Sequence, residues 1–141
     1  MARGFTLVEL IVVLIILGIL ATLALTQYRG VIERTRGSEA RAILGLIRFQ
    51  AEAYRMDKDD FLTFTPANVG IGTSNNQAPS SCRKSHYFSY SVVTSGTDVV
   101  TGIATRCTTG GKTPNNTAAN VLFLVSNVIQ GTDEWTGTGN Y

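Results

Sequence analysis

A run of sixteen uncharged, mostly apolar residues near the N-terminus, residues 10–25, constrains this chain more than any other feature. Counted from Phe5, the apolar segment holds 21 residues. A helix of that length is about 30 Å long, which matches the hydrocarbon core of a bilayer. Arg3 lies on its N-terminal flank and predicts that this end stays in the cytoplasm while the rest of the chain crosses outward. So long an uncharged run argues against the core helix of a soluble protein.

Glu9 lies inside this segment and separates the remaining interpretations. A plain membrane anchor, or a secretory signal peptide cut near Thr22–Ala24, does not require a carboxylate there. A charged side chain costs about 2.5–3.5 kcal/mol at the bilayer centre and less near an end, so one that is kept usually has a partner. On a helix Glu9 lies one turn from Phe5, on the same face. Cleavage between Gly4 and Phe5 would create an ammonium group at Phe5 that could be this partner.

The heptapeptide Gly4–Leu10, GFTLVEL, resembles the cleavage and methylation motif of the type IV pilin and pseudopilin family. The strong resemblance covers about residues 4–28. It implies that a membrane aspartyl prepilin peptidase cuts after Gly4 and that Phe5 is then N-methylated. It also implies that Glu9 pairs with the Phe5 amine of an adjacent subunit during assembly. Thr26 stands where many family members have a proline, which puts a kink at that point in doubt.

Residues 28–56 continue the helix but change its character. One apolar stripe follows helical spacing and is expected to pack on a sheet; it comprises Ile32, Ala40, Ile43, Leu44, Ile47, Ala51 and Tyr54. Charged residues fill the other faces, and Arg29 with Glu33 and Arg48 with Glu52 form i,i+4 pairs. These charges read either as a solvated face or as groups that set the register between neighbouring subunits. The whole rod is predicted from about Thr6 to about Met56.

The rest of the chain is polar and rich in turn-forming residues. Residues 87–93 alternate with a strand period, residues 94–98 form a turn, and residues 99–106 return, which predicts a β-hairpin centred on Ser95 and Gly96. That register sets Cys82 and Cys107 nearly opposite each other at the open end of the hairpin. Two cysteines beyond an exported segment favour a disulfide over a pair of buried thiols.

Two further features complete the predicted head. Residues 121–125 read as a buried strand, while residues 131–141 show no apolar period, and Trp135 is expected to pack on the sheet edge. The fold class is therefore predicted as α+β, with a long N-terminal helix packed on a small antiparallel sheet in the shape of a ladle. The expected organisation is a leader at residues 1–4, a membrane or filament-core helix at residues 5–27, and a head at residues 28–141.

No catalytic constellation is evident. His86 is the sole histidine and lies near Cys82, but a disulfide would remove the thiol. The acidic stretch Asp57–Asp60 lacks the spacing and the glycine of an EF-hand loop, so neither a metal nor a cofactor is predicted. A basic group could bind DNA, with a solubilising surface as the simpler interpretation; it comprises Arg83, Lys84, Arg106 and Lys112.

These observations predict a structural subunit rather than an enzyme. The expected partners are further copies of the chain in a helical filament, prepilin peptidase, the inner membrane and the pilus or secretion machinery. The precursor is expected in the inner membrane with its head outside the cytoplasm, and then in an extracellular pilus or a periplasmic pseudopilus. A major pseudopilin of a type II secretion system is the nearest alternative, and a secreted binding protein with an ordinary signal peptide is the alternative from another class.

Overall fold

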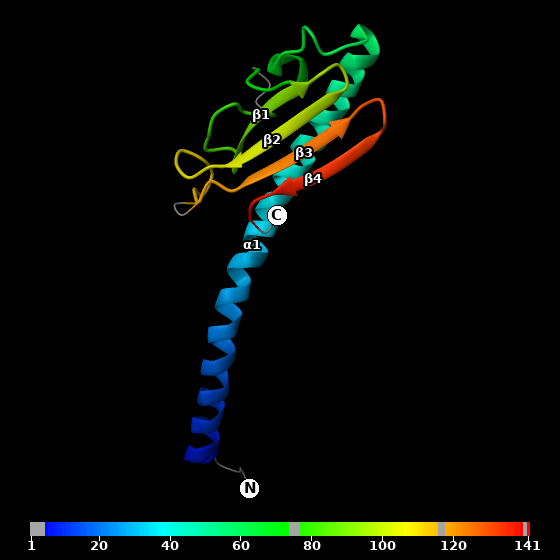
Figure 1. Ribbon diagram of the computed structural model, residues 1–141. Helices are drawn as coiled ribbons and strands as arrows, with labels where there is room; N and C mark the ends of the chain where they lie inside the picture. Colours follow the sequence, from blue (N-terminus) through cyan, green and yellow to red (C-terminus); the bar gives the residue numbers. More distant parts are fainter. Residues whose placement is uncertain (1–4, 74–76, 116–117, 140) are drawn as a thin grey trace.

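The computed structural model describes residues 5–73, 77–115, 118–139 and 141, and within α1 it leaves the side chains of Thr26 and Arg29 undescribed. A single helix, α1 (Leu7–Lys58), projects far beyond a head that holds η1 (Pro66–Val69) and a four-stranded sheet (Figure 1). The strands are β1 (Phe88–Ser95), β2 (Val99–Arg106), β3 (Val121–Asn127) and β4 (Thr132–Gly137). They form an antiparallel meander in the order β1-β2-β3-β4, which confirms the α+β class.

Helix α1 holds 52 residues and is about 78 Å long at the standard helical rise. The helix passes through residue 26 without a break, at the position where many members of the resembled family have a proline. Asp59 ends it in the left-handed region, with a φ of 61°, and donates its backbone N–H to the Arg55 carbonyl. The predicted Arg48–Glu52 pair is present at 2.9 Å, whereas the predicted Arg29–Glu33 pair involves a side chain outside the described part.

The upper half of α1 packs against the sheet through the predicted apolar stripe. Ala40, Leu44, Ile47 and Ala51 are all buried, with exposed fractions of 1% or less. Gly102 of β2 makes this approach possible, because a Cβ at that position would lie 2.9 Å from Leu44 Cδ2. The head therefore has one core between one helix face and one sheet face.

The predicted hairpin exists, but its register was wrong. Ser95 pairs with Val99, so β1 runs two residues further than expected and the turn is centred on Thr97. Gly96 adopts a φ of 65° at the start of this three-residue loop, a conformation that a glycine adopts without strain. A register that depends on one backbone conformation in the turn could not be read from strand alternation.

Two further differences concern the C-terminal strands. The predicted buried strand at residues 121–125 is present as β3, but its burial alternates: Leu122, Leu124 and Ser126 are buried and the residues between them are half-buried. Strand β4 was not predicted, because all six of its residues are exposed. Trp135 lies within this edge strand and is 40% exposed. Trp135 pairs with the buried Leu124 and is the one apolar residue of β4 on the helix-facing side, and a single apolar residue gives no period-2 signal.

Candidate assembly site

The first turn of α1 holds Glu9 in a capping box with Thr6. The Glu9 Oε2 accepts hydrogen bonds from the Thr6 backbone N–H at 2.9 Å and from the Thr6 hydroxyl at 2.8 Å. In return the Glu9 N–H donates to Thr6 Oγ1 at 3.3 Å. The carboxylate is thus fixed at the positive end of the helix dipole. Phe5 directly precedes the cap residue Thr6 and is 77% exposed. Gly4, the other predicted processing residue, lies outside the described residues.

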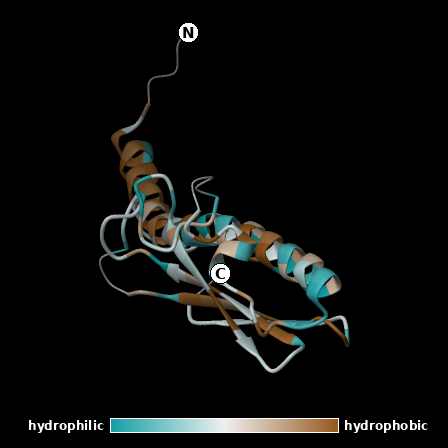
Figure 2. Ribbon diagram, turned by 90° about the horizontal axis from the view of Figure 1, so that it is seen from above, coloured by the Kyte–Doolittle hydropathy of each residue, from teal (hydrophilic) through white to brown (hydrophobic). Residues whose placement is uncertain are grey.

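The lower half of α1 after this turn has no protein around it. Every large apolar side chain from Leu7 to Leu25 is exposed, from 47% at Val13 to 73% at Leu7. Among the described residues α1 is the one helix long and apolar enough to cross a membrane, and its most apolar window is 0% buried. Figure 2 shows this half almost wholly hydrophobic, in contrast with the mixed head half. Such a surface needs either lipid or other protein chains around it.

The head half of α1 is fixed to the sheet by arginines seven residues apart. Arg48 Nε lies 2.8 Å from Asp133 Oδ1 of β4. Arg55 Nη2 lies 3.3 Å from Asp98 Oδ1 in the β1–β2 turn, and its Nε donates to a carbonyl of the same turn. Arg41 is the lower member of the series and contacts the other end of β4. The seven-residue spacing places all three on one side of the helix, beside the sheet edges they hold.

Arg41 and Gly37 secure the end of the described chain to α1. The Arg41 guanidinium donates to the Tyr141 carbonyl oxygen at 2.9 Å and lies 5.5 Å from the centre of the Trp135 ring. The Tyr141 ring packs over Gly37, where a Cβ would lie 2.8 Å from its Cδ1, and contacts Phe88 edge to face. Gly37 therefore lets an aromatic ring lie directly against the helix backbone.

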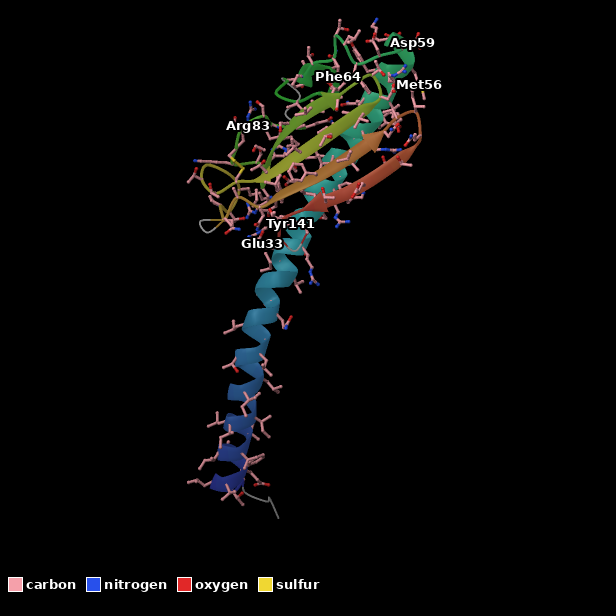
Figure 3. The ribbon with its side chains drawn as sticks, in the orientation of Figure 1. Glu33, Met56, Asp59, Phe64, Arg83 and Tyr141 are labelled. Carbon is pink, nitrogen blue, oxygen red and sulfur yellow. A yellow bond between two sulfur atoms is a disulfide. The ribbon has the colours of Figure 1, made fainter. Side chains whose placement is uncertain are left out.

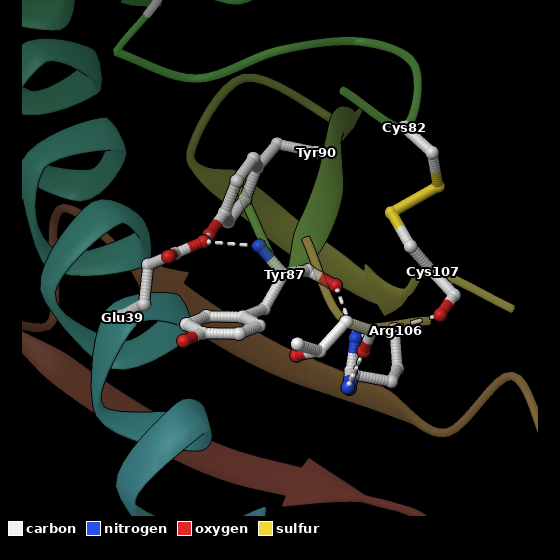
Figure 4. Close-up of a disulfide and its surroundings, with 7 residues drawn as sticks. Glu39, Cys82, Tyr87, Tyr90, Arg106 and Cys107 are labelled. Atoms are coloured by element: carbon white, nitrogen blue, oxygen red, sulfur yellow. Dashed lines mark hydrogen bonds between the residues drawn. A yellow bond between two sulfur atoms is a disulfide. The ribbon is translucent and has the colours of Figure 1, made fainter. Parts of the chain in front are cut away.

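Glu39 holds the start of the hairpin from the helix side. Its Oε1 accepts hydrogen bonds from the Tyr87 backbone N–H at 3.0 Å and from the Tyr90 hydroxyl at 3.3 Å (Figure 4). Burial, reinforced by the Glu39 carboxylate, raises the pKa of the Tyr90 hydroxyl far above its usual range. The phenol therefore stays protonated and continues to donate to Glu39.

Arg106 is the main surprise of the head. It belonged to the predicted DNA-binding group, but it is 1% exposed and cannot present its charge to a ligand. Its guanidinium donates to the carbonyls of Tyr87 at 2.9 Å, Thr113 at 2.7 Å and Cys107 at 3.4 Å, and its Nε lies 3.3 Å from Glu33 Oε2. A buried guanidinium with four acceptors ties β2, β1 and the following loop to α1. The basic residues that remain exposed in that group are Arg83, Lys84 and Lys112.

Glu33 completes this connection at the point where α1 leaves the head (Figure 3). Burial tends to raise the pKa of its carboxyl, but hydrogen bonds and attraction from Arg106 and Arg36 outweigh burial and lower the pKa below its ordinary value. Glu33 also forms an i,i+3 ion pair with Arg36. The charged form is thus the one that the folded head stabilises.

The predicted disulfide joins Cys82 to Cys107, with Cα atoms 5.7 Å apart. The pairing was right, although the register that suggested it was wrong. Cys107 lies at the ladder position of Tyr87 and donates its N–H to the Tyr87 carbonyl at 3.0 Å. A turn in which the His86 N–H donates to the Arg83 carbonyl brings Cys82 back to this point. Both sulfurs are bonded, so neither is a nucleophile beside His86.

The acidic stretch at the top of α1 does not form a metal centre in the described structure. Asp57 pairs with Lys58 at 2.9 Å, and Asp60 Oδ1 accepts the Leu62 backbone N–H at 2.9 Å. Within residues 5–73, 77–115, 118–139 and 141, no three His, Cys, Asp or Glu side chains gather closely enough to hold a metal ion.

Comparison with known proteins agrees with the N-terminal geometry. A family described as the prokaryotic N-terminal methylation motif matches residues 1–25. The type IV major fimbrial protein FimA of Dichelobacter nodosus is 38% identical over 71 residues, which cover 48% of this chain and 46% of that protein. The chain is therefore similar to type IV fimbrial proteins and carries their N-terminal methylation motif.

Other fimbrial proteins match a similar share of this chain. A second FimA of Dichelobacter nodosus is 37% identical over 82 residues, 55% of this chain and 51% of that protein. The fimbrial protein EcpC of Eikenella corrodens is 41% identical over 56 residues, 40% of this chain and 37% of that protein. The chain thus spans about half the length of the curated relatives it matches, or less. No solved structure matches it significantly.

Proposed function

We propose that this chain is a pilin, a structural subunit that polymerises into a type IV pilus-like filament. One observation carries the proposal: a processing motif directly precedes a helix whose lower half is exposed on every side. The upper half of the same helix is fixed to a folded head. This division suits a subunit that stands in a membrane and then exchanges lipid for the helices of other subunits. No catalytic role is part of the proposal.

Processing would prepare the first turn of α1 for assembly. Prepilin peptidase removes residues 1–4, and methylation of Phe5 leaves a secondary ammonium group. The Thr6–Glu9 capping box supports this step, because it holds the carboxylate at the helix start where such a cation would lie. Glu9 of one subunit then pairs with the Phe5 ammonium of its neighbour.

Glu9, rather than the apolar surface, makes the transfer of the helix from lipid into the filament favourable. Moving an apolar side chain from lipid to a fibre core gains little hydrophobic free energy, because both surroundings are apolar. A charged carboxylate, in contrast, costs up to about 2.5–3.5 kcal/mol in lipid, and less near the helix end. Pairing with a cation removes that cost, so polar pairing and close packing favour the filament over the dispersed subunit.

Topology and location follow from this proposal. Residues 5–27, which include the lower half of α1, span the inner membrane before assembly, and the head lies outside the cytoplasm. The disulfide supports an oxidising location for the head. After assembly the subunit is extracellular, and the names of the fimbrial relatives support a surface fibre rather than a periplasmic pseudopilus.

The N-terminal mass of the protein in a sheared surface fraction tests the proposal. A chain that begins with methylated Phe5 and sediments with fibres is expected. A chain that begins near Leu25 would point to an ordinary signal peptide and overturn the proposal. A methylated chain that stays in the periplasm would support the pseudopilin alternative.

A further inference from the structure

An open groove lies between α1 and the last described residues, at the base of the head. Its volume of about 560 Å³ is within the range typical of ligand sites. Its described lining holds no carboxylate and consists of Arg34, Arg41, Gly139 and Tyr141. Figure 3 shows Tyr141 beside Glu33, where α1 leaves the head towards its exposed apolar half. The groove is therefore at the end of the head from which the apolar segment projects.

The positive charge of this groove is not neutralised within the described head. Arg34 is exposed, and no hydrogen bond or ion pair in the described part of the chain uses it. Arg41 contacts a carbonyl oxygen and the Trp135 ring, and no carboxylate among the described residues. The carboxylates of this stretch of α1, Glu33 and Glu39, are bound to other residues of the head. Two such guanidinium groups attract an anion.

Arg34 stands close to the lipid headgroups when the apolar half of α1 spans a membrane. Leu25 ends the uncharged run, and Arg34 follows nine residues later, about 13.5 Å further along the continuous helix. The headgroup layer is about 5–7 Å thick on each side of the hydrocarbon core. An arginine side chain is long and flexible enough to cover the remaining distance. Tyr28, which is 64% exposed, lies between them at the boundary where aromatic residues are typical of membrane proteins.

We infer that this groove binds the phosphate headgroup of an anionic glycerophospholipid, in the outer leaflet of the membrane in which the chain stands. The inference rests on the membrane location proposed above and adds a specific lipid contact to it. Arg34 donates to the phosphate oxygens from the membrane side of the groove, because a guanidinium matches a phosphate with two parallel hydrogen bonds. Arg41, about 10 Å higher on the same side of the helix, adds attraction for the anion from the far wall.

The position of the groove favours a lipid over another protein chain. The acidic stretch Asp57–Asp60 of a second copy is the competing anionic occupant, but Asp59 lies at the opposite end of the head (Figure 3). Lipid headgroups lie directly below the groove as soon as the chain is inserted. A bound headgroup holds the base of the head against the bilayer, so the chain keeps a fixed depth before assembly. This contact breaks when the subunit leaves the membrane.

Native mass spectrometry of the full chain, released from nanodiscs, tests the inference. The nanodiscs contain equal parts of phosphatidylglycerol and phosphatidylcholine, and the retained lipids are identified by their masses. We expect the wild-type chain to retain phosphatidylglycerol about fivefold more often than phosphatidylcholine, and Arg34→Gln to lose this preference. Arg34→Lys keeps the charge and should keep most of the preference. Lys84→Gln removes the same charge from another exposed part of the head and should retain it fully.

The other outcomes overturn the inference. An equal preference in wild type and Arg34→Gln would place the anionic lipid elsewhere, and no preference in wild type would mean that the apolar half binds lipid without regard to its headgroup. Loss of the lipid in excess inorganic phosphate would show a site for the free anion. If Arg34→Gln lowers fibre yield and leaves lipid retention unchanged, the groove binds a second copy.

Failure of this inference is distinguishable from failure of the proposed function. A mature chain that begins near Leu25 would lack the membrane span altogether and would sink both. A chain that keeps the span and forms fibres, but shows no headgroup preference at Arg34, sinks only the lipid site.

Discussion

The two halves of α1 share one unbroken helix but depend on different surroundings. Above Glu33 the helix is held by the head through buried apolar residues, two carboxylates and three arginines. Below Glu33 the most apolar window of the helix is 0% buried within the described residues, so its surroundings must come from lipid or other subunits. The difference implies that changes in the lower half should alter assembly and leave head stability intact, while changes in the head should do the reverse.

The largest expected effect is on assembly. Replacing Glu9 with Val removes the only carboxylate of the apolar half, so we expect membrane insertion to persist and fibre yield to fall at least about tenfold. The thermal unfolding of the head should not change. Sheared fibre mass and the membrane-bound pool are the measurements. Glu134→Gln, an exposed carboxylate on β4, is the control and should keep normal yield. Normal fibres from the Glu9 variant would refute its role in assembly.

A change in the head should instead lower head stability, and the largest loss is expected at Arg106. Arg106→Leu leaves Glu33 without its buried partner and takes the guanidinium donor from three carbonyls, of which those of Tyr87 and Cys107 keep a backbone donor. We expect a loss of about 3–5 kcal/mol in the free energy of unfolding, because breaking a buried ion pair leaves the other charge unpaired. Denaturant unfolding of the full chain in detergent measures it. Lys112→Leu is the matched control, because its exposed ammonium only lies 4.9 Å from the Tyr87 ring centre. Equal losses in both variants would contradict the bridging role of Arg106.

A smaller loss is expected from the disulfide. Replacing Cys82 and Cys107 together with Ser opens a loop closed across a separation of 25 residues. The chain-entropy model gives about 3–4 kcal/mol for such a loop. The midpoint of denaturant unfolding should fall in the double variant and, by the same amount, in the reduced wild-type chain. An unchanged midpoint in both cases would mean that the head does not depend on this bond.

Two glycines of α1 sharpen the comparison within the head half. Gly45 has nothing within 4 Å of an added Cβ, so Gly45→Ala should stabilise the head by up to about 1 kcal/mol through helix propensity. Gly37→Ala instead pushes on the Tyr141 ring, and overpacking should reverse the sign to a loss of about 1 kcal/mol. Thermal unfolding of both variants measures the difference, and the same sign in both would contradict the packing of Tyr141 on Gly37.

The features that the sequence predicted are those with a local period. The span of α1, its buried stripe and the first hairpin follow from spacing alone, and the cysteine pair follows from count and context. The missed features depend on tertiary placement. The fourth strand has a single apolar residue, Trp135, on its inward side, and the hairpin register depends on Gly96. Arg106 is buried only because Glu33 and three carbonyls surround it. The seven-residue spacing of Arg41, Arg48 and Arg55 is visible in the sequence. Their contacts with β4 and with the β1–β2 turn depend on the tertiary fold and could not be predicted from it.

The smallest expected effect is a dependence on pH at the boundary between the two halves. The pKa of the Glu33 carboxyl is lowered in the folded head, because Arg106 and Arg36 outweigh the effect of burial. A lowered pKa stabilises the fold at pH values above the ordinary pKa of 4.5, and this contribution is lost as the pH falls through the folded-state value. The unfolding midpoints of wild type and Glu33→Gln should therefore differ at pH 7 and converge in acid. A difference that stays constant down to low pH would assign Glu33 a packing role instead of a charge-dependent one.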